Sequence, residues 1–180
     1  MNILRSFQNK IISMPVKHPW LIDVEAYCSW LTDFDKDANK TWARYRRMSL
    51  IAFANYYGNS IPEIKSYFIN NHLEFKRYPA KYDFEYAGYK IKIVPTNVNE
   101  KWNIGPLLHA RLTEKAYAKD NDYYILVAYD ISRISIIGWM THEMAGMTKN
   151  RGYYEIHEHD CLQMDQLELL NSKDNLRWYY

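Results

Sequence analysis

Two short segments near the middle of the chain alternate between apolar and polar residues. They span residues 81–86 and 89–94, with Ala87 and Gly88 between them. Successive side chains of a strand point to opposite faces, so this alternation predicts two strands joined by a two-residue turn. One face is apolar and is expected to be core: Tyr82, Phe84, Tyr86, Tyr89, Ile91 and Ile93. The opposite face gathers two acids and two bases: Asp83, Glu85, Lys90 and Lys92.

Apolar residues at helical spacing precede this hairpin. Residues 21–31 and residues 41–57 each have this spacing and are predicted to be helices. Ser60 and Glu63 are three positions apart, which is the spacing of a capping box. We therefore expect Ser60 to cap a third helix that continues to about residue 71.

The second half of the chain predicts a further helix and a second pair of strands. A helix is expected over residues 106–120, and the apolar run at 123–129 indicates a buried strand. Residues 134–139 are expected to form a neighbouring strand. A short helix is expected to start at Thr141, and residues 153–157 are expected to add an edge strand. This order of elements predicts an α/β fold with a central mixed β-sheet flanked by helices.

Composition narrows the class of protein. A chain of 180 residues without internal repeats or linkers is expected to be a single domain, with residues 1–40 as an N-terminal helical segment. The net charge of +2 argues neither for nor against nucleic acid, so any basic surface must be local. The 17 Tyr residues are typical of sheets and equally of binding surfaces.

Targeting signals and cysteine usage favour a cytoplasmic, intracellular protein. Cys28 and Cys161 lie far apart and lack metal-ligand spacing, so reduced thiols are expected. Apolar runs stay well short of the roughly 18 residues of a membrane span, and the first residues do not read as a signal peptide. We therefore expect no membrane association.

The order of elements over about residues 56–170 resembles that of phage-type and restriction-type nucleases of the PD-(D/E)XK superfamily. The segments that carry the resemblance are YYGNSIPEIKSYFI, YDFEYAGYKIKIVPT, DNDYYILVAYD, IIGWMTHEM and CLQMDQL. The resemblance implies a restriction-endonuclease-like fold, DNA as the partner and Mg²⁺ as the cofactor. Phosphodiester hydrolysis of this kind needs a divalent ion held by carboxylates, with a lysine nearby to stabilise the developing charge.

The family's site residues carry over to this chain only in part. Glu63 matches the helix glutamate and Asp83 matches the first strand aspartate, but the D/E-x-K triplet falls on Lys92, Ile93 and Val94. A lysine at a metal-ligand position repels the ion. A relocated site would use Asp83 and Glu85 as metal ligands, with Lys92 as the catalytic lysine and Glu63 joining from the helix.

Two functions therefore stay open. The first is a divergent Mg²⁺-dependent endonuclease that uses Asp83, Glu85, Lys92 and Glu63. The second is an inactive descendant that binds DNA or a host protein, because Asp83–Lys92 and Glu85–Lys90 also form an ordinary cross-strand charge ladder. A structural phage component is a third, weaker hypothesis, and a homodimer is compatible with each.

Basic residues on the predicted second helix are candidates for nucleic-acid binding. Arg44, Arg46 and Arg47 lie there together with Trp42 and Tyr45, and Lys90 adds a charge on the hairpin. Such a mixture of cations and aromatic rings can bind phosphates and stack on bases. The same pattern is also typical of the solvated face of an amphipathic helix.

Overall fold

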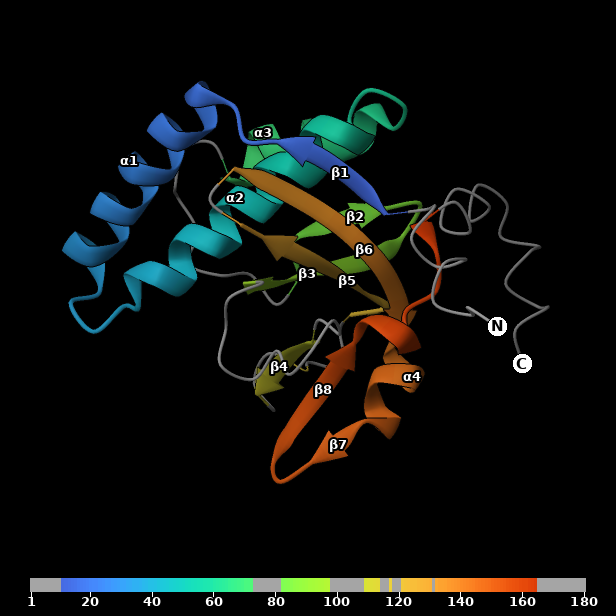
Figure 1. Ribbon diagram of the computed structural model, residues 1–180. Helices are drawn as coiled ribbons and strands as arrows, with labels where there is room; N and C mark the ends of the chain where they lie inside the picture. Colours follow the sequence, from blue (N-terminus) through green and yellow to red (C-terminus); the bar gives the residue numbers. More distant parts are fainter. Residues whose placement is uncertain are drawn as a thin grey trace.

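The computed structural model describes residues 11–72, 82–97, 109–113, 117, 121–130 and 132–164. These residues form three layers (Figure 1). Three helices cover one face of a five-stranded sheet, and a small three-stranded sheet with a short helix covers the other face. The predicted α/β class and the mixed central sheet are confirmed. None of the helices in the described ranges combines the length and the apolar character needed to cross a membrane.

The central sheet has the strand order β1-β6-β5-β3-β2. Its strands are β1 (Ile12–Pro15), β6 (Arg133–Thr141), β5 (Tyr123–Tyr129), β3 (Tyr89–Asn97) and β2 (Phe84–Tyr86). Strands β3 and β5 are parallel, and the other neighbours are antiparallel. All seven residues of β5 are buried, as the apolar run over residues 123–129 predicts, because both faces of this strand are covered.

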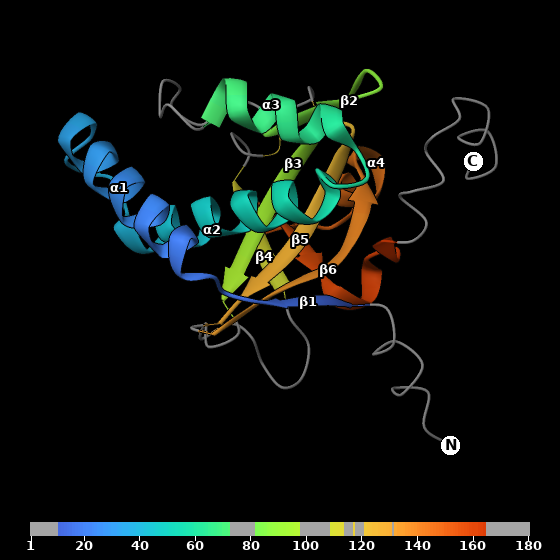
Figure 2. The same ribbon diagram turned by 90° about the horizontal axis from the view of Figure 1, so that it is seen from above.

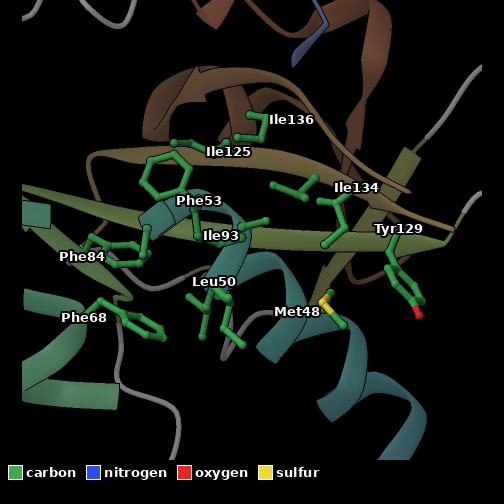
Figure 3. Close-up of a cluster of buried hydrophobic side chains, with 14 of the residues drawn as sticks. Met48, Leu50, Phe53, Phe68, Phe84, Ile93, Ile125, Tyr129, Ile134 and Ile136 are labelled. Atoms are coloured by element: carbon green, nitrogen blue, oxygen red, sulfur yellow. The ribbon is translucent and has the colours of Figure 1, made fainter. Parts of the chain in front are cut away.

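The helical layer consists of α1 (His18–Phe34), α2 (Lys40–Tyr57) and α3 (Pro62–His72). Helix α2 runs across the sheet and packs on β3 and β5, while α1 and α3 pack beside it (Figure 2). It begins where the Asn39 side chain accepts a hydrogen bond of 3.0 Å from the backbone N–H of Trp42. The core between these layers is aliphatic and aromatic, with Phe53, Phe84, Ile93 and Ile125 at its centre (Figure 3).

The layer on the other face contains β4 (His109–Thr113), β8 (Tyr153–His157), β7 (Lys149–Asn150) and α4 (His142–Met147). Strand β8 lies between β4 and β7, so the prediction of an edge strand over residues 153–157 was wrong about its position. A second core fills the space between this layer and the central sheet, and it includes Leu112, Leu126 and Ile156.

The helix expected over residues 106–120 was a wrong prediction for the part of that segment that the structure describes. Residues 109–113 are strand β4, which pairs with β8. The sequence there is rich in helix-forming residues, but Ala110 and Leu112 are two positions apart and both enter the second core. Tertiary pairing therefore overrides the local helix preference. The rest of the expected helix lies outside the described residues, as does most of the segment after Cys161.

The hairpin predicted over residues 81–94 was correct in its turn and its register. The pairs Phe84–Ile91, Glu85–Lys90 and Tyr86–Tyr89 are opposite one another, which confirms the predicted hairpin register. Positive φ angles of 50° at Ala87 and 83° at Gly88 are those of the turn that two-residue hairpins favour.

Two caps at helix ends had different outcomes. The short helix expected from Thr141 is α4, and Thr141 is its N-cap, since its side chain accepts a hydrogen bond from the backbone N–H of Met144. Ser60 does not form the expected capping box. Its N–H and hydroxyl both donate to the carbonyl oxygen of Tyr57, so it belongs to the end of α2, and α3 begins at Pro62.

Candidate functional site around Asp83

Asp83 is fixed at the point where strand β2 begins. Its backbone N–H donates to the carbonyl oxygen of Ile91 at 2.8 Å, and one carboxylate oxygen (Oδ2) accepts from the N–H of Ile93 at 2.9 Å. The carboxylate therefore takes the place of a backbone acceptor at the edge of β3. The residue is 0% exposed, so both oxygens must find their partners inside the protein.

Two cations neutralise the other carboxylate oxygen of Asp83. Its Oδ1 forms an ion pair with Nη2 of Arg46, and Nζ of Lys92 lies 3.7 Å from the same atom. Arg46 comes from α2 and is 2% exposed, whereas Lys92 comes from β3 and is 8% exposed. The guanidinium of Arg46 also lies 5.5 Å from the ring centre of Trp42. Asp83 thus links the helical layer to the edge of the sheet.

The charge state of this cluster follows from its partners. Burial alone would raise the pKa of Asp83, but the positive charges of Arg46 and Lys92 hold that pKa below its usual value. Burial lowers the pKa of Lys92, and the neighbouring Asp83 opposes that effect. Asp83 is therefore an ionised carboxylate at neutral pH, and its charge is matched within the fold.

His72 closes the cluster from the end of α3. The carbonyl oxygen of Asp83 accepts a hydrogen bond of 2.8 Å from Nε2 of His72. The imidazole ring stacks on Phe68 with 5.5 Å between ring centres, and it lies 5.8 Å from the ring of Phe84. This burial lowers the pKa of His72, so the ring is neutral at neutral pH.

A second, partly buried ion pair joins Arg47 of α2 to Asp23 of α1. Arg47 contacts both carboxylate oxygens of Asp23, at 2.6 and 2.9 Å, and donates to the carbonyl oxygen of His72 at 2.9 Å. Its guanidinium lies 5.2 Å from the ring centre of Tyr27 and 5.1 Å from that of Phe68. The residue is 1% exposed. Arg47 therefore joins α1, α2 and the end of α3.

These contacts correct the prediction of a basic nucleic-acid surface on α2. Arg46 and Arg47 are enclosed and paired with carboxylates, so neither guanidinium is exposed at the surface for a phosphate contact. Arg44 is the outward member of the three, and it pairs with Glu25 at 2.8 Å. Lys90 places its Nζ 5.3 Å from the ring centre of Tyr82. A continuous basic strip from α2 to the hairpin is thus not formed by the four predicted residues.

The structure brings together some of the predicted catalytic residues and separates others. Asp83 and Lys92 meet, as their cross-strand positions predict. Glu85 is half-buried and lies opposite Lys90. Glu63 is exposed in the first turn of α3, whereas the carboxylate of Asp83 is enclosed.

The arrangement does not fit Mg²⁺. This ion binds through carboxylate oxygens and keeps several waters, so its ligands need free lone pairs and solvent access. Both oxygens of Asp83 already have donors, and two of those donors are cations that would repel a metal. Within the described ranges, no cluster of three or more His, Cys, Asp or Glu side chains is placed to hold a metal ion.

The role of Arg46 has almost no signal in the sequence. Its partner is 37 positions away, and an arginine on an amphipathic helix usually faces solvent. Comparisons of the chain with protein-family models, with curated proteins and with solved structures find no match. The features of the chain that bear on its function are the order of its elements and the cluster of Asp83, Arg46 and Lys92.

Proposed function

We propose that this chain is a restriction-endonuclease-like protein that binds DNA and does not cut it. The observation that carries the proposal is the enclosure of the Asp83 carboxylate by Arg46 and Lys92. The order of α3, the β2–β3 hairpin, β5, β6 and the short helix α4 supports the nuclease-like scaffold. DNA is the partner that this resemblance implies.

The chemistry of the cluster explains why binding is favoured over cleavage. A metal at such a site polarises the phosphate and turns bound water into a nucleophile. The ammonium of Lys92 and the guanidinium of Arg46 place two positive charges beside the single negative charge of Asp83. Both groups are hydrogen-bond donors, and neither can coordinate water and phosphate together as a metal ion does. These two side chains compensate the charge of the buried Asp83 carboxylate, so the folded state does not depend on a metal ion at this position.

A metal-dependent nuclease is the second candidate, and one distance favours it. Lys92 lies 3.7 Å from Asp83, which is close enough for a lysine that acts beside a metal ligand. This function would require Arg46 to leave the carboxylate and Glu85 to supply the second metal ligand. Glu85 is half-buried, so its replacement perturbs the core less than a change at Asp83.

A cleavage assay with two carboxylate variants separates the two functions. Supercoiled and linear DNA are incubated with Mg²⁺ or Mn²⁺ and with wild type, Asp83→Asn, Glu85→Gln, or the control Glu143→Gln, which alters an exposed acid on α4. We expect DNA retardation on a gel without metal-dependent nicking by any of the four proteins. Nicking by wild type and the control that is lost in Glu85→Gln, a variant whose fold is verified by circular dichroism, would overturn the proposal.

A further inference from the structure

The β7–β8 hairpin projects on the side of the molecule away from helices α1 to α3 (Figure 1). Its turn consists of Arg151 and Gly152, whose φ angles are 48° and 84°. Positive φ at both central residues is the geometry of a tight two-residue turn that matches the twist of a β-ribbon. The turn places Arg151 at the exposed tip.

The hairpin end of this layer is positively charged. Residues 144–154 contain Lys149 and Arg151 and no acidic residue, and both cations are exposed. The first acid that follows, Glu155, has a side chain that is only 14% exposed. It is engaged by Arg111 at 3.1 Å, by His157 at 3.5 Å and by Asn150 at 3.4 Å. Its negative charge is therefore matched inside the small sheet, and the tip keeps its positive charge.

Two neighbouring tyrosines give the hairpin a rigid base and an exposed ring. Tyr154 stacks on Tyr117 with 3.7 Å between ring centres, and Nζ of Lys149 lies 5.5 Å from the ring centre of Tyr154. Tyr153 alternates to the outer face and is 44% exposed. The cations and the exposed ring are thus held on a ribbon that is anchored to the second core.

We infer that the β7–β8 hairpin binds duplex DNA, with Lys149 and Arg151 on phosphates and Tyr153 against the sugars or base edges of a groove. The major groove admits an element as wide as a two-stranded β-ribbon. Strand β8 also pairs with β4, so the part that would enter a groove is β7 with its turn. Phosphate contacts from Lys and Arg would supply most of the affinity. Charge complementarity favours a polyanion, and the narrow hairpin with an exposed ring beside its cations favours a groove of DNA over a broad acidic protein surface. This inference rests on the proposed function, and it moves the DNA contact from α2 to the opposite layer.

The salt dependence of binding tests the inference. Fluorescence anisotropy of a labelled duplex measures the affinity of wild type, of Lys149→Gln/Arg151→Gln, and of the control Lys36→Gln/Lys65→Gln. The control removes the same charge from exposed positions of the helical layer. Each lost phosphate contact lowers the slope of log affinity against log salt by about 0.9. The slope of the hairpin variant should therefore be shallower than that of wild type by about 1.8. When the salt is raised from roughly 50 to 200 mM, the loss of affinity of the variant should be smaller than that of wild type by a factor of about 12.

Different failures overturn different claims. Equal slopes for the hairpin variant and wild type would overturn this inference and leave DNA binding in place. Binding of single-stranded DNA alone would contradict a ribbon in a duplex groove. Failure of wild type to bind any DNA would overturn both this inference and the DNA partner in the proposed function. A Tyr153→Ser variant should weaken binding without changing the slope, because it removes ring contacts and no charge.

Discussion

Replacing Asp83 by Asn keeps the size of the side chain and removes its charge. Asn can still accept the hydrogen bond from the N–H of Ile93. The variant leaves Arg46 and Lys92 buried without a counter-ion from Asp83. The expected result is therefore a large loss of folding stability that comes from the two cations and not from altered packing.

The size of this loss follows from the burial of the cluster. Removing one partner of a buried ion pair costs about 3–5 kcal/mol. With a urea dependence of about 2 kcal/mol per molar, the unfolding midpoint should fall by about 2 M. The exposed pair of Arg44 and Glu25 provides the comparison, since Glu25→Gln should cost less than about 1 kcal/mol.

Urea unfolding followed by circular dichroism measures both variants and a double variant. Asp83→Asn combined with Arg46→Met should cost less than the sum of the single changes, because each single change leaves a buried charge without its partner. A loss below about 1 kcal/mol for Asp83→Asn would refute the reasoning. If Asp83→Asn were more stable than wild type, Asp83 would instead be a functional carboxylate whose presence lowers the stability of the fold.

Three further predictions concern other parts of the fold. Burial lowers the pKa of His72 below its ordinary 6.5, so the unfolded chain takes up this proton first as the pH falls. Stability should therefore fall as the pH drops below 6.5 towards the folded-state pKa, and His72→Gln should flatten this dependence in urea titrations between neutral and acidic pH. Ala87→Asn should stabilise the hairpin by about 1 kcal/mol, because Asn tolerates the φ of 50° better than Ala; an unchanged urea midpoint would argue against this. Gly138→Ala should cost about 1–3 kcal/mol, since its Cβ would lie 2.5 Å from the carbonyl oxygen of Leu162; unaltered thermal unfolding would contradict the close approach.

Features that depend on neighbouring residues could be predicted from the sequence. The register of β2 and β3 follows from the turn at Ala87 and Gly88, and the cap of α4 follows from Thr141. The meeting of Asp83 and Lys92 follows from the same register. In each case the residues that determine the feature lie within about ten positions of one another. The structure adds which other side chains pack around them.

Features that depend on distant residues could not be predicted in the same way. Strand β4 forms because β8 pairs with it, and the paired residues lie 40 to 48 positions apart along the chain. Arg46 and Arg47 are buried because Asp83 and Asp23 meet them from other elements. The local pattern of α2 is equally typical of an exposed basic face, so the sequence alone does not distinguish the two.

The most direct test of the account is whether a divalent metal ion changes the free energy of unfolding. If Arg46 and Lys92 occupy the Asp83 carboxylate, a metal ion has no site there and cannot stabilise the folded protein. A ligand that binds only the folded protein at a hundred times its Kd adds about 2.7 kcal/mol to stability. We predict that the unfolding free energy in Mg²⁺ or Mn²⁺ equals that in KCl of the same ionic strength. A stabilisation by metal that is present in wild type and absent in Asp83→Asn would contradict the account.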